Sequence, residues 1–510
     1  MDTTYQSAQE FMQVMTIPQL TPLQTWVSFI FMLAIIIYMM VATPTIQWLV
    51  NYSERKLRND PTLEVPLSNR VEIALSGDIG APIGAVLLSL ILVYFFNCDF
   101  EVIKYKFLEV PWHEVLLVSG IMFQSLQQGR ITTHILAWLQ KLTSEKVNDD
   151  YQINERKFSA LAIPSLGLLS SLFTEVGMGS LTVIPFFKVN ENQSMEVKKR
   201  LVILLETSIG IGGGLTKFAA PPIVIAAKIF GWSHLETFMY LAPFVLSVLV
   251  YIGYQTYKCT DETVDATPIK TKPIWKIDII NAILWVVFLY VGAFFHGNFT
   301  IDLTDYFEGV KGNIGPMFLM MVTLVVSFFI NLGHIFFREP RKDDGKKHKV
   351  PMFHLCHQAF ESKLVFLLLA GLLFLGVMSS GIFVIFGQLL PQNEFIKIFV
   401  LYLTTDVGSA FMDNALAVLQ LAPLAKLCGD FAVIAAIAIA IASLIGGIVT
   451  VFGNAVNVVI FNTLKRTKEI TPIKMGYFEW TCRSFGLWFK LTMGGIVYIM
   501  IAATFVKFVI

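Results

Sequence analysis

Residues 404–423 read TTDVGSAFMDNALAVLQLAP, a polar stretch inside an otherwise apolar part of the chain. Two carboxylates, Asp406 and Asp413, occur here, and Asn414 follows the second of them. An ionised aspartate at the middle of a bilayer costs at least about 2.5–3.5 kcal/mol on insertion scales, so it normally serves a function. We therefore expect this segment to contribute to a functional site.

A similar pattern occurs in the first half of the chain. SLFTE (171–175) matches SAFMD (409–413), and IGGGLTKFA (211–219) matches IGGIVTVFG (445–453). This alignment pairs Glu175 with Asp413 and Thr216 with Thr450. Two motifs in the same order at nearly the same spacing indicate a duplication, and we interpret the chain as a duplicated membrane transporter.

The composition excludes several classes of protein. Of 510 residues, 55% are apolar and only 15% are charged, whereas soluble proteins carry about 25% charged residues. The net charge of +1 gives no basis for binding nucleic acid. The five cysteines form no CxxC pair, so we expect neither a disulfide framework nor a bound metal. No motif of a hydrolase or nucleotide-binding enzyme occurs in a fitting context, so we expect a transporter driven by an ion gradient, with no cofactor.

Apolar runs long enough to span a bilayer lie at 24–50, 80–97, 112–140, 200–231, 236–257, 277–295, 314–337, 363–388, 430–463 and 486–508. The stretches 158–188 and 395–425 are interrupted by Gly, Pro and polar residues, so we expect each to form a re-entrant hairpin. With the N-terminus outside, we expect the cytoplasmic segments to be 51–73, 141–157, 188–200, 258–276, 338–363 and 464–485. These segments then carry most of the 38 Lys and Arg residues, which follows the positive-inside rule.

The sequence thus predicts an all-α polytopic membrane protein of two inverted repeats, each with a re-entrant hairpin and an interrupted transmembrane helix. We place an external N-terminal tail at 1–23 and the first repeat at 24–257. A cytoplasmic linker at 258–276 leads to the second repeat at 277–510.

The interrupted helices are expected to hold the site. Glycines permit unwinding, and an unwound span exposes carbonyl oxygens and helix ends that can coordinate a small cation. Asp413 is the strongest candidate for a group that binds either sodium or a proton, and Glu175 is the second. The candidate cation- and proton-binding residues are Asp413, Asn414, Glu175, Asp406, Thr405, Ser409, Thr450, Asn454, Asn457 and Thr216. Glu206 ranks behind them, because we expect it at the cytoplasmic start of its span.

Lys217 follows Thr216 in the first interrupted helix. A lysine at that depth needs a partner, either an internal carboxylate or an anionic substrate. If Lys217 pairs with Asp413 or Glu175, cation binding could break the pair and release a proton. Without such a partner an anion site is favoured, and extension of the side chain to the interface is the third interpretation.

At residues 409–414, SAFMDN, the chain resembles the ion transporter superfamily, which includes arsenite pumps, NhaD-type sodium/proton antiporters and divalent-anion symporters. Over its full length it is similar to a bacterial family of sodium/proton antiporters. The resemblance implies a homodimer in the bacterial inner membrane that moves its hairpin domain like an elevator. The first half departs from the family pattern, because Glu175-Val176 stands where Asp-Asn is expected and Lys217 is additional.

Three functions remain open at this point, and we predict the first of them rather than the anion transporter or an enzyme. The first is exchange of sodium or lithium for protons, with Asp413 at the centre of the site. The second is an ion-coupled anion transporter, either a carboxylate symporter or an oxyanion exporter, that uses Lys217 and helix N-termini. The third is a membrane enzyme or scaffold in which the repeated carboxylates are structural.

Overall fold

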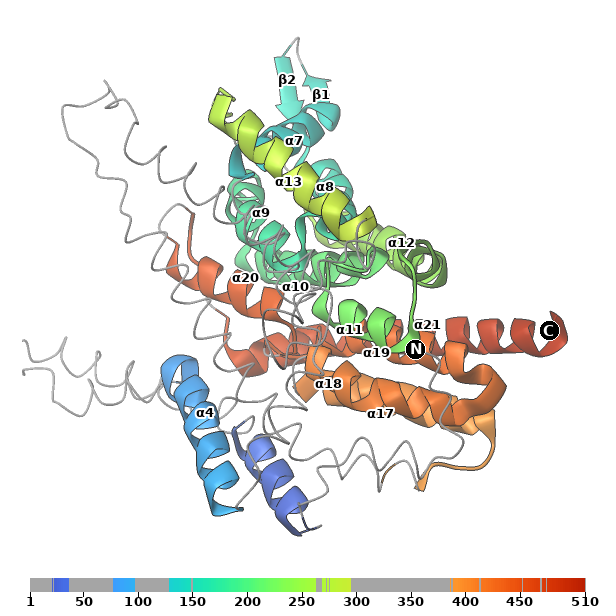
Figure 1. Cartoon of the computed structure of the whole chain (residues 1–510). Coiled ribbons are helices and arrows are strands. Elements are labelled where there is room, and N and C mark those ends of the chain that lie inside the picture. Colours follow the sequence, from blue (N-terminus) through green and yellow to red (C-terminus); the bar gives the residue numbers. More distant parts are fainter. Residues whose placement is uncertain are drawn as a thin grey trace, which may run out of the picture.

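The computed structural model describes residues 21, 23–35, 77–96, 128–147, 150–262, 268–271, 273–274, 276–294, 386, 389–411, 414–451, 453–467, 470–473 and 475–509, which Figure 1 shows in colour. The described residues are mostly helical, at 82%. The helical segments His234–Cys259, Ala417–Gly446 and Phe478–Thr504 are each long and apolar enough to cross a membrane. The presence of these three segments agrees with the composition, which predicts a membrane protein. The tail at 1–23 and the predicted spans at 314–337 and 363–388 lie almost entirely outside the described residues.

The elements in chain order are α4 (Gly77–Phe95), α7 (Gly129–Leu142), β1 (Ser144–Val147), β2 (Asp150–Ile153), α8 (Glu155–Phe173), α9 (Glu175–Val189), α10 (Met195–Gly212), η1 (Gly213–Leu215), α11 (Pro221–Phe230), α12 (His234–Cys259), α13 (Lys276–Phe294), α17 (Glu394–Phe411), α18 (Asn414–Leu421), η2 (Ala422–Phe431), α19 (Ala432–Gly446), α20 (Ala455–Arg466) and α21 (Tyr477–Val509). A further apolar helix lies at Leu23–Ile35.

The prediction of an all-α protein is wrong at one place. Strands β1 and β2 pair as an antiparallel hairpin in which Ser144 lies opposite Ile153. The two strands contain Val, Tyr and Ile, which favour extended backbone, and a polar sequence connects them. The strands precede α8, in a segment that we expected to be a cytoplasmic loop.

Helices α8 and α9 form a helical hairpin, which we call the first hairpin. At its open end the Ser159 hydroxyl donates to Oδ1 of Asn190 over 2.7 Å. At its closed end the chain turns at Thr174, whose φ of 61° is the single positive φ of a non-glycine residue in the described part of the chain. The Thr174 side chain caps α9 by accepting from the N–H of Gly177. A β-branched residue in this conformation is strained, and such strain is often found at functional sites.

Helix α17 and the following α18 and η2 form the second hairpin. Near its open end the Lys397 ammonium donates to the carbonyl of Leu427 over 3.0 Å, and the Phe395 and Phe431 rings are 5.1 Å apart. Gly429 has non-helical φ and ψ of 56° and −126°, which separates this hairpin from α19. Figure 1 shows the first hairpin in the upper part of the molecule and the second in the lower part.

Each hairpin packs against a helix that is interrupted by glycines. The first broken helix runs from α10 through η1 to α11, and Pro221 begins its last segment. The second broken helix consists of α19 and α20, which Asn454 restarts as the N-cap of α20. Glycine and proline weaken helical hydrogen bonding, so both interruptions lie where the sequence predicts them. We call each hairpin with its broken helix a unit.

The two units are built with the same three hydrogen bonds between hairpin and broken helix. In the first unit these are Ser170 Oγ to Ile209 O, Thr216 Oγ1 to Ser171 O, and Glu175 N to Ala219 O. In the second unit they are Ser409 Oγ to Ser443 O, Thr450 Oγ1 to Ala410 O, and Asn414 N to Gly453 O. Equivalent donors and acceptors therefore hold both hairpins, and Thr216 and Thr450 occupy the same place in their units.

These bonds change the alignment of the hairpin motifs by one residue. Ser170, not Ser171, corresponds to Ser409, and Glu175 corresponds to Asn414. The sequence alone could not distinguish the two registers, because Ser170 and Ser171 are adjacent. When the two units are aligned in this way, the tip carboxylate of the first unit lies one position after that of the second, because Glu175 aligns with the residue that follows Asp413.

Glycines bring the backbones of each unit into direct contact. A Cβ atom on Gly212 would overlap the carbonyl oxygen of Gly167, and one on Gly446 would overlap the carbonyl oxygen of Asp406. Because only glycine allows this approach, the motif glycines fix how closely each hairpin lies against its broken helix. This close backbone contact is shared by both units, in addition to the three hydrogen bonds. It shows that Gly167 of the first unit corresponds to Asp406 of the second.

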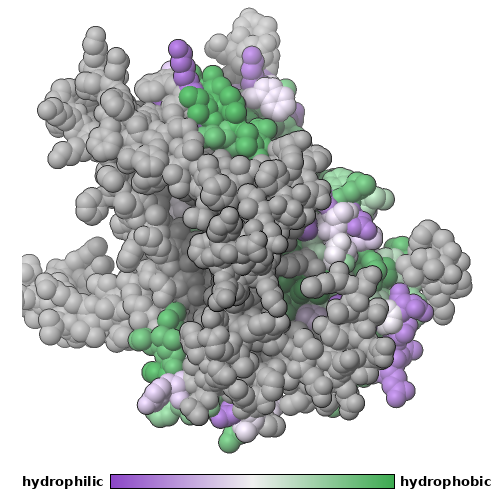
Figure 2. Space-filling view, viewed as in Figure 1, coloured by the Kyte–Doolittle hydropathy of each residue, from purple (hydrophilic) through white to green (hydrophobic). Residues whose placement is uncertain are grey.

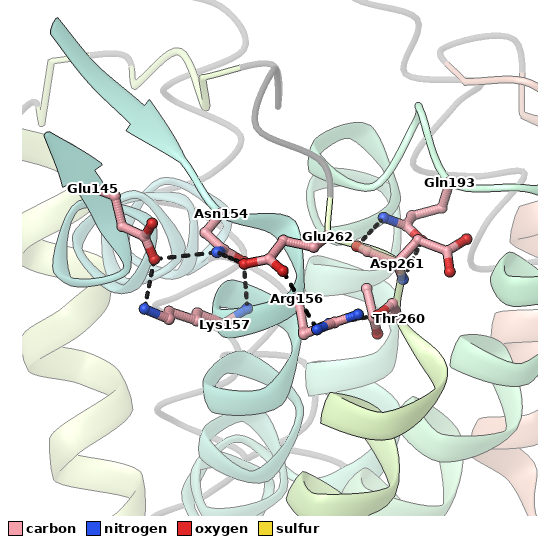
Figure 3. A network of polar contacts seen from close by, with 8 residues as sticks. All are labelled: Glu145, Asn154, Arg156, Lys157, Gln193, Thr260, Asp261 and Glu262. Atoms are coloured by element: carbon pink, nitrogen blue, oxygen red, sulfur yellow. Dashed lines mark hydrogen bonds and ion pairs between the residues drawn. The ribbon is translucent and has the colours of Figure 1, made fainter. Parts of the chain in front are cut away.

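A polar network joins three segments that we expected in the cytoplasm (Figure 3). The N–H of Asp261 donates to Oε1 of Gln193, and the Arg156 guanidinium donates to the carbonyl of Thr260 over 2.9 Å. In the same network a hydrogen bond and the charge of the Lys157 ammonium lower the pKa of the Glu145 carboxyl. The start of α8, the end of α9 and the end of α12 thus lie at one end of the first unit.

Apolar side chains are exposed on α12 and α21. Val250 is 74% exposed and Ile501 is 64% exposed, although both lie in helices long enough to cross a membrane. In Figure 2 strongly hydrophobic residues reach the surface in several patches. Exposed apolar faces of this kind suit contact with lipid.

Candidate functional site

The two units meet at a buried hydrogen bond between Glu175 and Asn454. The Asn454 side-chain amide donates to Oε2 of Glu175 over 2.9 Å, and both side chains are buried. Oδ1 of Asn454 accepts from the backbone N–H of Val456 at 3.2 Å, which sets the orientation of the amide. The contact joins the tip of the first hairpin to the second broken helix and brings together two predicted site residues that are 279 positions apart.

The interruption in the first broken helix lies directly against the same carboxyl group. A Cβ atom on Gly213 would be 2.6 Å from Cγ and 2.7 Å from Oε1 of Glu175. The glycine therefore lets the Glu175 side chain lie on the backbone where α10 ends and η1 begins.

A second carboxyl group, Glu206, lies in this region. Its side chain is 1% exposed, and the Thr207 hydroxyl donates to its Oε2 at 3.4 Å. Its carboxyl group also lies near the Asn457 side chain and interacts electrostatically with Glu175. A Cβ atom on Gly210 would lie 3.2 Å from Nδ2 of Asn454 and 4.0 Å from Oε1 of Glu206, so these groups gather on one side of α10.

The expectation that Glu206 lies at the cytoplasmic start of its span is wrong. Ser194 caps α10 by accepting from the N–H of Val197, so the helix begins earlier than the apolar run suggests. Glu206 consequently lies well inside the helix. The signal was present in the sequence, because residues 206, 210 and 213 are spaced for one face of a helix.

Asn457 holds the interruption of the second broken helix. Its Nδ2 donates to the carbonyls of Gly447 at 2.7 Å and Thr450 at 2.8 Å. The hydroxyls of Thr450 and Thr216 each donate to a hairpin carbonyl, as described above. These residues thus fix the unwound backbone around the Glu175–Asn454 contact.

Asn414 begins α18 at the tip of the second hairpin. Its backbone N–H donates to the carbonyl of Gly453 at 3.1 Å, next to Asn454. The side chain is 2% exposed, and its Nδ2 has no hydrogen-bond partner among the residues that the structure describes. Asp413, the residue before it and our strongest candidate, lies outside the described residues. Its role stays a prediction.

Asp406 is directed toward a different helix. It is fully buried, and its two carboxylate oxygens accept from the Trp488 indole at 2.9 Å and the Thr492 hydroxyl at 2.7 Å. Thr405 donates to the carbonyl of Leu401, and Ser409 bonds to the broken helix as described above. We interpret Asp406 as the group that anchors the second hairpin to α21.

We expect Asp406→Ala to destabilise the protein by about 1–3 kcal/mol for each donor that it leaves unsatisfied. The thermal midpoint in detergent should fall, while the ion exchange that the sequence predicts is retained per folded molecule. Asp430→Ala is the control, since Asp430 is an exposed carboxylate in the same hairpin. A loss of exchange at unchanged stability would instead place Asp406 in the site.

Lys217 lies beside the first interruption and is half-buried. Within the described part of the chain it forms neither an ion pair nor a hydrogen bond. The predicted pair with Asp413 concerns a residue outside the described ones and stays a prediction.

The site is therefore a buried group of two carboxyls and two amides, supplied by both units. Carboxylate and amide oxygens are ligands for hard cations, and a carboxylate can also hold a proton. Two ionised carboxylates side by side in an apolar interior repel each other, so a proton or a cation between them is favoured. The sequence matches no model of a known protein family, and a search of curated proteins found no match.

Proposed function

We propose that this protein is a secondary active transporter that exchanges sodium or lithium for protons. The observation that carries the proposal is the buried bond between Glu175 and Asn454, because it joins the tip of one unit to the interruption of the other. A carboxylate surrounded by amide and carbonyl oxygens can hold a small hard cation. When the cation leaves, the same carboxylate can take up a proton. One group that holds either ion is sufficient for exchange.

We further propose that the two units are inverted repeats with re-entrant hairpins. The equivalent hydrogen bonds of the two units support the duplication. The first hairpin opens beside Thr260, near the end of α12, whereas Tyr240, near the start of α12, bonds to Tyr498 of α21. In the second hairpin, α17 runs antiparallel to α21, because Tyr402 is hydrogen-bonded to Thr492 and Asp406 to both Thr492 and Trp488. These contacts support entry of the two hairpins from opposite ends.

In this proposal Asp413, beside Asn414, binds the cation or proton together with the Glu175 region. Alternating access exposes the site to each side of the membrane in turn. The resemblance to sodium/proton antiporters supports a homodimer in a bacterial inner membrane with the N-terminus outside.

A second candidate, ion-coupled anion transport, is favoured by Lys217. A half-buried lysine beside an unwound helix, without an ion pair in the described part of the chain, can bind a carboxylate or oxyanion. This function needs Lys217 at the substrate, whereas exchange needs the carboxylates.

The test is proton movement in proteoliposomes, followed with a pH-sensitive dye on addition of sodium, lithium, potassium or a dicarboxylate. We expect a response to sodium or lithium in the wild type and none in Asp413→Asn, because the amide cannot carry the proton. Uptake of a labelled anion that is lost in Lys217→Met, with no cation-driven proton movement, would replace the antiporter with the second candidate.

A further inference from the structure

We propose that Glu206 is a direct ligand of the transported cation, which it binds together with Glu175 and Asn457. The assignment deepens the antiporter function and rests on it for the identity of the ion. Only the first unit supplies this ligand, because the residue at the equivalent place in the second broken helix is Ala440.

The first argument is that two oxygen atoms in this region lack a partner. Within the described part of the chain, neither Oε1 of Glu206 nor Oδ1 of Asn457 has a hydrogen-bond partner. Glu206 is 1% exposed and Asn457 is fully buried, so bulk water does not solvate them. Leaving a buried acceptor unsatisfied costs about 1–3 kcal/mol, and more for a charged group. A bound cation would satisfy both oxygens at once.

The second argument is charge. Glu206 of α10 and Glu175 of α9 interact electrostatically, and Glu206 forms no ion pair with the residues that the structure describes. Asn457 already donates both amide protons to the carbonyls of the second interruption, which leaves its oxygen as the free coordinating atom. A cation between the carboxyls removes their repulsion.

The third argument is the type of ligand. The atoms available are the carboxylate oxygens of Glu206 and Glu175 and the amide oxygen of Asn457. Oxygen ligands select hard cations such as sodium and lithium over soft metals. Gly210 lets these groups approach the α10 backbone, because a Cβ atom there would lie only 3.2 Å from Nδ2 of Asn454.

The experiment measures sodium binding to the purified full-length protein by radiolabelled sodium in a scintillation proximity assay, at constant ionic strength. We expect Glu206→Gln to weaken sodium affinity at least about tenfold, as expected for loss of a charged ligand. Glu155→Gln is the matched control, since Glu155 is an equally buried glutamate that accepts a hydrogen bond from Gln193. Glu155 begins α8 and so lies at the open end of the first hairpin, away from the site. Its sodium affinity should be unchanged.

A second measurement uses the wild type, so that it does not depend on the folding of a variant. Sodium should slow modification of Glu206 by a hydrophobic carbodiimide, read by peptide mass spectrometry, while potassium should not. Wild-type affinity in Glu206→Gln, or equal modification with and without sodium, overturns the assignment of Glu206. Competition by calcium in preference to sodium also overturns it.

The two proposals fail in different ways. Sodium-driven proton movement in the wild type, with sodium affinity unchanged in Glu206→Gln, leaves the antiporter intact and removes Glu206 from its site. Absence of both sodium binding and sodium-driven proton movement in the wild type removes the antiporter itself.

Discussion

Glu175→Gln should reduce sodium-driven proton movement at least about 100-fold, which corresponds to about 2.7 kcal/mol. The glutamine oxygen can still accept the hydrogen bond from Asn454, so the contact between the units is retained. What is lost is the negative charge and the ability to carry a proton. The measurement is the initial rate of dye dequenching in proteoliposomes at several sodium concentrations.

The control for this variant is Glu155→Gln, which makes the same chemical change at a buried glutamate outside the site. It should exchange ions at the wild-type rate. If Glu175→Gln also exchanges normally and is as stable as the wild type, the buried contact with Asn454 is structural and the proposed function loses its main support.

Gly446→Ala should prevent folding of the second unit. The added Cβ would overlap the carbonyl oxygen of Asp406, a backbone atom that cannot move without displacing α17. Overpacking against side chains costs about 1–3 kcal/mol, and we expect this clash to cost at least about 3 kcal/mol. Fluorescence-detected size exclusion after expression, followed by thermal melting of any folded fraction, measures the effect.

Gly486→Ala is the control for Gly446→Ala. A Cβ atom at Gly486 of α21 has no neighbour within 4 Å, and alanine favours helix, so folding should be unaffected. A monodisperse Gly446→Ala protein with a wild-type melting temperature would show that α17 and α19 do not approach as closely as described.

The sequence predicted both interruptions and both helical hairpins, because glycine, proline and polar residues stand out within long apolar stretches. It also predicted the pairing of equivalent threonines, since Thr216 and Thr450 are the hydroxyl residues of the repeated motif. It could not predict that Glu175 corresponds to Asn414, because the adjacent Ser170 and Ser171 fit the motif equally well. The alignment of the two hairpin motifs depends on which serine hydroxyl bonds to the broken helix, and in the structure it is that of Ser170.

The sequence also could not predict which side chains from distant segments contact each other. Asp406 was a candidate for the cation site, but its carboxylate accepts hydrogen bonds from Trp488 and Thr492 of α21. Nothing local to residue 406 identifies those donors. Glu206 was ranked too low because an apolar run does not mark where a capped helix begins, and its neighbours Glu175 and Asn457 come from other elements.

Each of the two units carries an acid at a place where the other unit has Gly or Ala. At equivalent places the first has Gly167 and Glu206, whereas the second has Asp406 and Ala440. The acid of the first unit faces the shared centre, and the acid of the second faces α21. In the proposed transporter, the first unit thus supplies an extra acid to the ion site, whereas the second unit uses its extra acid to attach to α21. A protein rebuilt from two identical copies of either unit would therefore lack one of these two roles.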